Sequence, residues 1–172
     1  MKLQSISESD FHQIDGARQL IADSHPRKFA SLELGENLGV YGLGWNSELI
    51  EPELVCSADG QTVWVGVDQY LAAIETANGR IRVVLKLHTN LFQIMVLERL
   101  TAVRTETEIL LFNPDFSIFL NKGFPDITEE ISFECDKLVI RFLEKDSLTL
   151  DLPVASISNS RGKEVKTQAA TP

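Results

Sequence analysis

The sequence predicts a mainly β domain in which antiparallel strands follow one another in successive meanders, preceded by one N-terminal helix. The first observation is a pair of hairpin signals, Asp59-Gly60 and Asn78-Gly79, each flanked by Val, Ile, Tyr or Trp. Such pairs favour tight turns because type I′ turns need two residues with positive φ. The second observation is that turn signals recur about every nineteen residues from Leu54 on, the length of two short strands with their turns. We therefore expect about twelve strands in a single domain over residues 1–152.

Residues 9–23 carry the helical pattern. Ser9 can cap the first turn, and Pro26 ends the segment. Four apolar residues recur at spacings of three and four: Phe11, Ile14, Ala17 and Ile21. Gly16 lowers the intrinsic stability of such a helix. We therefore expect the helix to depend on packing and to cover an exposed apolar edge of the sheet.

Residues 35–45 contain four glycines between apolar and aromatic residues. The segment lacks the Gly-Lys-Ser/Thr of a phosphate-binding loop and the helix that follows a dinucleotide-binding turn. Two interpretations remain open. The glycines let a strand bend or bulge, or the segment is a flexible loop that carries Tyr41 and Trp45 to a binding surface.

The strand pairs after residue 50 form larger repeating units. Two hairpins taken together give a period of about thirty-seven residues, which is typical of stacked or radial repeat proteins. The units are residues 51–87, 91–122 and 127–152, the third shortened because its second turn comes early. The tail, 153–172, is polar and locally basic, and its composition predicts disorder. Alternation along the strands predicts a core of Val63, Val65, Ile74, Val83, Leu85, Ile109, Leu111, Ile118, Leu120, Leu138, Ile140 and Phe142.

Two stretches of the first unit resemble repeats of a known architecture. Ser57 to Gly66, SADGQTVWVG, is similar to the SxDGxxxxxG segment of β-propeller blades. Asp68 to Ile81 resembles the strand-turn-strand of quinoprotein-type propeller repeats. The resemblance implies blade-like units of a partial propeller. It covers about a hundred residues, lacks the Trp-Asp dipeptide of WD repeats, and gives three copies where a ring typically has about four to eight. No ligand residue of that family is recognisable here, so the resemblance implies no cofactor.

Charge and composition narrow the compartments and partners that we expect. The formal charge of −9 argues against nucleic acid, which is bound through clustered Lys and Arg, and it is compatible with a basic protein partner or simply with solubility. No apolar run approaches the length of a membrane span, and the N-terminus lacks a secretory h-region, so we expect a cytoplasmic protein. For Cys56 and Cys135 we expect reduced, buried thiols rather than a disulfide.

Residues that could carry catalysis or bind a metal are scattered. His12, His25 and His88 lie far apart in the sequence, and no C-x-x-C or H-x-x-x-H occurs, so we expect no metal site and no cofactor. No G-x-S-x-G elbow occurs, and neither cysteine has a histidine close in sequence. The pattern favours a protein that is not an enzyme.

Two functional hypotheses follow. The first is a non-catalytic protein that binds another macromolecule, a scaffold or an inhibitor such as an immunity protein, with a protein partner that is basic. The alternative is a small-ligand or carbohydrate-binding or processing domain that uses Tyr41, Trp45 and Asp68. Asp68 also has a simpler interpretation as a turn former.

Assembly into a homodimer is suggested by two features. Phe116 stands at the turn position that Asn78-Gly79 occupies in the first unit. An aromatic residue there is either a dimer contact or a sign that the repeat register is locally wrong. The shortened third unit has no helix after it, so we expect its exposed edge to pair with a second chain.

Overall fold

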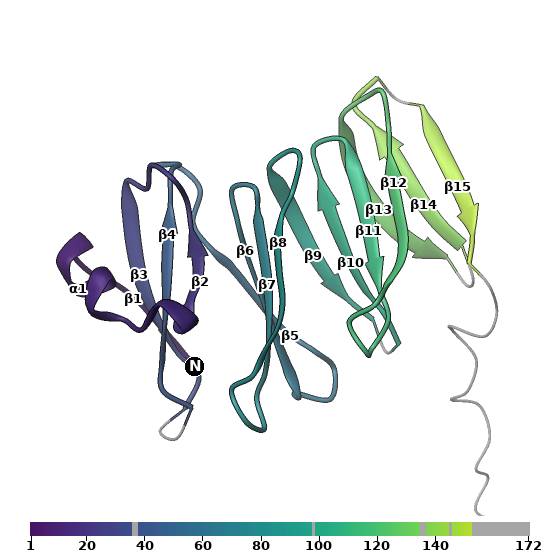
Figure 1. Cartoon of the computed structure of the whole chain (residues 1–172). Helices are drawn as coiled ribbons and strands as arrows, with labels where there is room; N and C mark the ends of the chain where they lie inside the picture. Colours follow the sequence, from purple (N-terminus) through teal and green to yellow (C-terminus); the bar gives the residue numbers. More distant parts are fainter. Residues whose placement is uncertain (36–37, 98, 135–136, 145, 153–172) are drawn as a thin grey trace, which may run out of the picture.

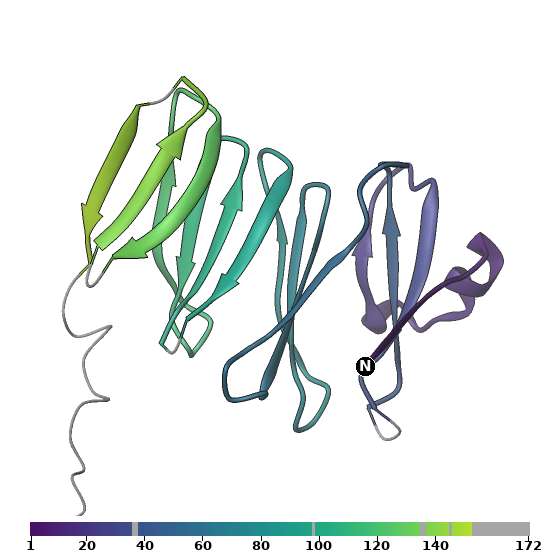
Figure 2. The same ribbon diagram turned by 180° about the vertical axis from the view of Figure 1, so that it is seen from behind.

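The computed structural model describes residues 1–35, 38–97, 99–134, 137–144 and 146–152. Four small sheets follow one another along the chain in a single row, as Figure 1 shows and Figure 2 shows from behind. Three have four strands and the last has three, so the sheets are blade-like. The predicted fold class, mainly β with antiparallel meanders and one N-terminal helix, is confirmed, and the described residues form fifteen strands where we expected about twelve.

The four sheets are called A to D in chain order. Sheet A has the order β1 (Lys2–Ser5), β3 (Lys28–Glu33), β4 (Val40–Trp45) and β2 (Gln19–Ala22). Sheet B has β5 (Glu53–Cys56), β6 (Thr62–Val67), β7 (Tyr70–Glu75) and β8 (Ile81–Lys86). Sheet C has β9 (Leu91–Val96), β10 (Thr101–Thr105), β11 (Glu108–Phe112) and β12 (Ile118–Gly123). Sheet D has β13 (Thr128–Glu134), β14 (Lys137–Phe142) and β15 (Ser147–Asp151).

The N-terminal helix is shorter than the predicted 9–23. Helix α1 spans Glu8–Gln13 and is capped by Ser7, not Ser9; a single 3-10 turn, η1 (Gly16–Arg18), follows it, and the chain then enters β2. Ile21, expected on the helix face, pairs instead with Leu43 in parallel register. Helix propensity is a weak preference, and pairing with β4 outweighs it here.

Hydrophobic cores fill the three spaces between consecutive sheets. The core between sheets A and B includes Leu32, Leu43 and Ile74. The core between sheets B and C includes Trp64 and Val103. The core between sheets C and D includes Leu111, Leu138 and Ile140. Nine of the twelve predicted core residues are buried. The other three are Leu85, Leu120 and Ile118, of which Ile118 is 48% exposed. They lie on β8 and β12, which are edge strands and therefore have a neighbour on one side only.

Two other predictions concern cysteine and the tail. Cys56 was expected to be buried, but it is exposed. It ends β5, an edge strand, beside the turn that starts at Ser57. Cys135 and the tail 153–172 lie outside the described residues.

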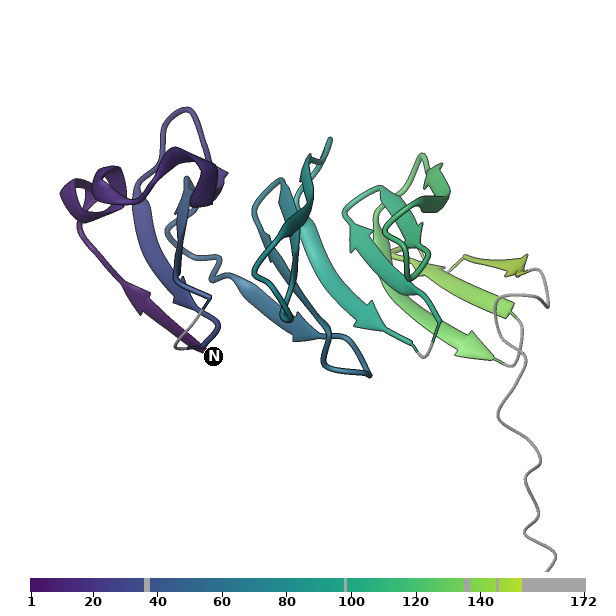
Figure 3. The ribbon, with the colours of Figure 1, turned by 60° about the horizontal axis from the view of Figure 1, so that its bottom comes forward.

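Helix α1 covers the outer face of sheet A, as Figure 3 shows at one end of the row. The rings of Phe11 and Phe29 lie 5.3 Å apart. On β4, Gly42 and Gly44 face the helix, while the alternating Tyr41, Leu43 and Trp45 are buried toward sheet B. The glycines of the 35–45 segment that lie in β4 therefore belong to a strand, and they allow the helix to approach it closely.

We expect Gly42→Ala to lower the free energy of unfolding by about 1–3 kcal/mol, the usual cost of overpacking. A Cβ atom at Gly42 would lie 2.9 Å from Cε2 of Phe11, which is itself buried. Gly35→Ala is the matched control, because a Cβ there meets nothing within 4 Å. Urea unfolding followed by circular dichroism measures both. Equal midpoints for the two variants would contradict close packing of α1 on sheet A.

The outer face of sheet D has a different character from that of sheet A. Because Leu138 and Ile140 face sheet C, their neighbour Val139 faces outward, paired with Ser132 and Thr149. Two ion pairs flank this row: Glu130 with Arg141 at 3.1 Å, and Lys137 with Asp151 at 3.7 Å. This face is therefore mostly polar. A second chain would pair more readily along the edge of β15 than on this face, and the homodimer stays a prediction.

Candidate functional site

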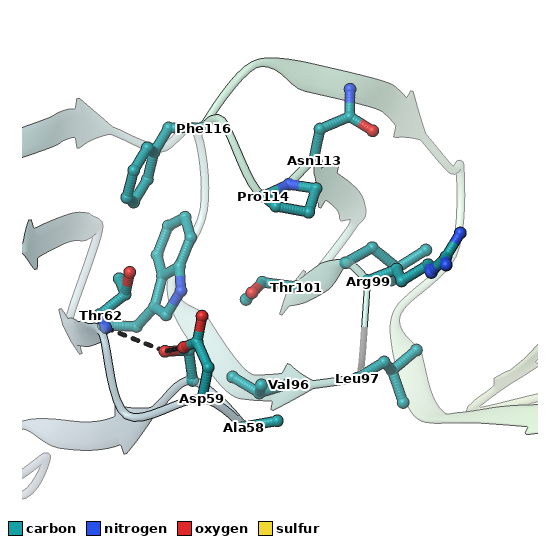
Figure 4. Close-up of a pocket in the computed structure, with 13 residues that line it drawn as sticks. Ala58, Asp59, Thr62, Val96, Leu97, Arg99, Thr101, Asn113, Pro114 and Phe116 are labelled. Carbon is teal, nitrogen blue, oxygen red and sulfur yellow. Dashed lines mark hydrogen bonds between the residues drawn. The ribbon is translucent and has the colours of Figure 1, made fainter. Parts of the chain in front are cut away.

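Two pockets lie at opposite ends of β6. The first, called the B–C pocket, has a volume of about 320 Å³ and lies where turns of sheets B and C meet. Its lining comes from the β5–β6 turn, the β9–β10 connection and the β11–β12 turn. In Figure 4, Phe116 and Thr62 lie on one side of this space, and Arg99 and Leu97 lie on the other. The lining residues are Ser57, Ala58, Asp59, Thr62, Trp64, Val96, Leu97, Arg99, Leu100, Thr101, Asn113, Pro114 and Phe116.

Phe116 has an unusual backbone conformation in the B–C pocket. Its φ is +71°, the same as that of Gly79 in the corresponding turn of sheet B. A bulky residue in this left-handed region is strained by about 1–2 kcal/mol. Its half-buried ring lies 6.0 Å from the ring of Trp64, and the guanidinium of Arg82 lies 4.8 Å from its centroid. Phe116 thus packs against sheet B at the turn position that the repeat pattern predicts.

The polar side of the B–C pocket includes a carboxylate. The hydroxyl of Ser57 donates to Asp59 Oδ1 at 2.5 Å and the amide of Gln61 donates at 2.9 Å. These bonds, the hydroxyl first, hold the pKa of Asp59 below its ordinary value. The turn that carries Phe116 repeats this arrangement, since the hydroxyl and amide of Ser117 lower the pKa of Asp115. Both turns therefore carry a negative charge at neutral pH.

The second pocket, called the A–B pocket, has a volume of about 440 Å³ and a mostly polar lining. Asp68 occupies the two-residue turn between β6 and β7, with φ +49°, and is only 7% exposed. Its Oδ2 accepts hydrogen bonds from the amides of Asn46 at 2.9 Å and Ser47 at 2.8 Å. Its Oδ1 has no hydrogen-bond partner among the described residues. The pocket is lined by Asp23, His25, Asn46, Ser47, Ile50, Asp68, Gln69, Tyr70 and Asn90.

Asp23 brings a second carboxylate to the A–B pocket. The amide of His25 donates to its Oδ1 at 2.8 Å and the hydroxyl of Tyr70 donates to its Oδ2 at 3.0 Å. The bond from His25 is the main cause that lowers the pKa of Asp23, although partial burial opposes it. Burial, followed by the bond to Asp23, raises the pKa of Tyr70. Lys86 Nζ lies 5.5 Å from the centroid of the Tyr70 ring.

The structure separates the three residues that sequence reasoning grouped as a ligand site. Asp68 lines the A–B pocket. Tyr41 is fully buried and donates its hydroxyl to the carbonyl of Gly79 at 2.6 Å. Trp45 is 3% exposed and donates Nε1–H to the carbonyl of Ile50 at 2.9 Å. Both aromatic residues therefore serve the core between sheets A and B, and neither lines the two pockets described above.

Two observations on the described residues concern metal binding and membrane spans. Within them, no three His, Cys, Asp or Glu side chains gather closely enough to hold a metal ion. No described helix has the length and apolar character needed to cross a membrane. Comparison with models of known protein families finds no match, and comparison with curated proteins finds none either.

We expect stability to decrease as the pH drops below about 4. The pKa values of Asp23, Asp59 and Asp115 are lowered from 3.8 in the folded chain. A carboxylate whose pKa is lowered by folding stabilises the folded state when the pH is above its pKa in the unfolded chain. This stabilisation is lost as the pH falls through its pKa in the folded chain. Glu53 acts in the opposite sense. Burial raises its pKa from 4.5, so its contribution is present at low pH and lost as the pH rises.

Thermal unfolding of the wild type and Asp59→Asn between about pH 2 and pH 7 measures this effect. Asparagine keeps an oxygen that can accept the bonds from Ser57 and Gln61 but has no proton to gain. On acidification, we expect the melting temperature of the variant to decrease less than that of the wild type. The same loss in both proteins would show that Asp59 does not contribute to the acid sensitivity.

Proposed function

We propose that this protein is a non-catalytic binding protein, a scaffold or an inhibitor of the immunity-protein kind, that holds a segment of another protein at the B–C pocket. The observation that carries the proposal is Phe116, a bulky residue with φ +71° at the edge of a pocket of about 320 Å³. Glycine would fit this conformation without strain, as Gly79 does in sheet B. Strained residues tend to gather at binding and catalytic sites.

The acidic character of the whole chain, with a formal charge of −9, favours a basic segment as the partner. Asp59 and Asp115 give the two neighbouring turns negative charge, which Arg99 and Arg82 balance locally. The ring of Phe116 already stacks with Arg82, so its face suits a guanidinium or ammonium group. Complementary charge speeds encounter and excludes acidic competitors.

We also propose that the row of blade-like sheets is an incomplete β-propeller of the quinoprotein or WD type. The segment that resembles a blade motif, Ser57 to Gly66, forms the β5–β6 turn and most of β6. The second resembling segment, Asp68 to Ile81, contains β7 and the turn into β8. In propellers the turns at the ends of the blades commonly carry binding sites.

Affinity capture from the native host with matched baits tests the partner proposal. Phe116→Gly removes the ring and relieves the left-handed backbone, and this relief offsets part of the packing that is lost against Trp64, so we expect the bait to fold. Leu49→Ser is the control, because Leu49 is 94% exposed and lies outside both pockets. We expect a basic protein to be captured by the wild type and by Leu49→Ser, and to be depleted at least tenfold on Phe116→Gly. Equal capture by all three baits would refute a role of the B–C pocket.

A second candidate function is the binding of a small ligand or a carbohydrate at the A–B pocket. The specific observation is Asp68, which lines this pocket and whose Oδ1 has no partner among the described residues. Buried polar atoms in folded proteins nearly always have a partner, so an exception calls for a water, an ion or a ligand. This candidate is independent of the B–C pocket.

A further inference from the structure

Asp68 presents an incomplete set of hydrogen bonds. Its carboxylate is 7% exposed, and the amides of Asn46 and Ser47 satisfy Oδ2 at 2.9 and 2.8 Å. Its Oδ1 is enclosed and has no partner among the described residues. Burying a carboxylate is costly unless each oxygen is hydrogen-bonded or paired with a cation. Two main-chain donors to one oxygen meet half of this requirement.

The surroundings of Asp68 supply acceptors and negative charge. Asp23 lines the same pocket, and its lowered pKa keeps it ionised at neutral pH. Lys86, beside the ring of Tyr70, supplies one positive charge close to Asp23. With His25 of the same lining counted as neutral, two carboxylates and one ammonium group leave one net negative charge among these groups. Asn46 and Asn90 add amide oxygens to the lining.

We propose that the A–B pocket binds a small molecule through a primary ammonium group, which pairs with the carboxylate of Asp68. This inference rests on the small-ligand function proposed second above and names the chemical class of that ligand. A primary ammonium has three donors and one positive charge, which match the unpartnered oxygen and the net charge of the pocket. Because Oδ1 is enclosed, binding there requires a compact head group and a displacement of the atoms that cover it, and a quaternary ammonium has no N–H to donate. The absence of three converging metal ligands in the described chain argues against a divalent metal as the occupant.

Titration of the full chain with ethylammonium chloride, followed by two-dimensional amide NMR, tests the proposal. The amides of Asn46 and Ser47 are the direct reporters, since both donate to Asp68. Ethanol is the uncharged probe of matched size, erythritol represents polyols, and sodium chloride controls for ionic strength. We expect saturable shifts of these two amides with ethylammonium alone. Asp68→Asn should weaken the binding at least tenfold, and Glu129→Gln, which removes an exposed carboxylate outside both pockets, should leave it unchanged.

Each other outcome has a defined meaning. Saturable shifts with erythritol but not with ethylammonium would overturn the ammonium inference and keep the small-ligand function. No saturable shift with either probe would overturn both the ammonium inference and the small-ligand function at this pocket. The partner proposal at the B–C pocket would be unaffected. Unchanged affinity in Asp68→Asn would overturn the role of Asp68. If that variant does not fold, Asp23→Asn replaces it, because Asp23 is only partly buried. An affinity within twofold of the wild type would then overturn the ammonium inference, because that inference requires the negative charge of the pocket.

Discussion

Trp64→Ala is expected to lower the free energy of unfolding by about 3–5 kcal/mol, the typical cost of removing a large aromatic side chain from a core. Trp64 is 2% exposed and is one of the few residues that both fill the core between sheets B and C and line the B–C pocket. Its ring lies 4.9 Å from that of Phe112. For a domain with a total stability of about 5–15 kcal/mol, this is a large fraction.

Guanidinium unfolding followed by circular dichroism measures the loss. Trp64→Phe is the matched control, which keeps a ring against Phe112 and should lose clearly less stability than Trp64→Ala. The chain has two tryptophans, so Trp45 is the only indole fluorophore left in either variant, and it reports on the core between sheets A and B. A loss below about 1 kcal/mol in Trp64→Ala would mean that sheets B and C do not pack through this residue.

Ile140→Ala is expected to cost about 2–5 kcal/mol. Ile140 is fully buried between sheets C and D and pairs with Ile131 and Leu148 on the neighbouring strands. Because each core joins only two consecutive sheets, the damage should stay near sheets C and D. Native-state hydrogen exchange should show lost protection in β14, with β3 and β4 retained.

Val139→Ala provides the matched control for this prediction. Val139 is the next residue on the same strand and faces outward, so its truncation should cost less than about 1 kcal/mol. Similar costs for the two variants would contradict the assignment of inner and outer faces in sheet D. Loss of protection in β3 after Ile140→Ala would contradict the independence of the three cores.

The sequence is a good guide where turn chemistry and alternation act locally. Asp59-Gly60 and Asn78-Gly79 lie in the turns of sheet B, as predicted, but only the glycines have positive φ, +69° at Gly60 and +71° at Gly79. Neither turn is therefore the type I′ turn that the pairs suggest. Sheet A has no such signals, and the identity of β2 depends on parallel pairing with β4, which residues 9–23 do not encode by themselves. The spacing of Phe11, Ile14, Ala17 and Ile21 fits a helix, whereas the short apolar run Leu20 to Ala22 at its end fits a strand as well.

The candidate site was less predictable because its residues meet only in the folded chain. The hydrogen bond from Tyr70 to Asp23 joins residues 47 positions apart, and no local pattern announces it. Asp68 was the exception, since an Asp after an apolar strand is a turn signal. The burial of Tyr41 and Trp45 follows from their alternation with Gly42 and Gly44, because a strand with glycines on one face and large side chains on the other buries the large side chains.

The outer face of sheet D differs from the faces of sheets B and C in what can pack against it. Sheets B and C are apolar on both faces and require a neighbour on each side, whereas sheet D is apolar on one face only. The difference resides in one cross-strand line, Ser132, Val139 and Thr149, and in the ion pairs beside it. Apolar residues along that line would turn a terminal sheet into an internal one. The architecture is therefore modular: a lineage could add or remove a sheet by changing the polarity of a single face, with the other sheets and their pockets left intact.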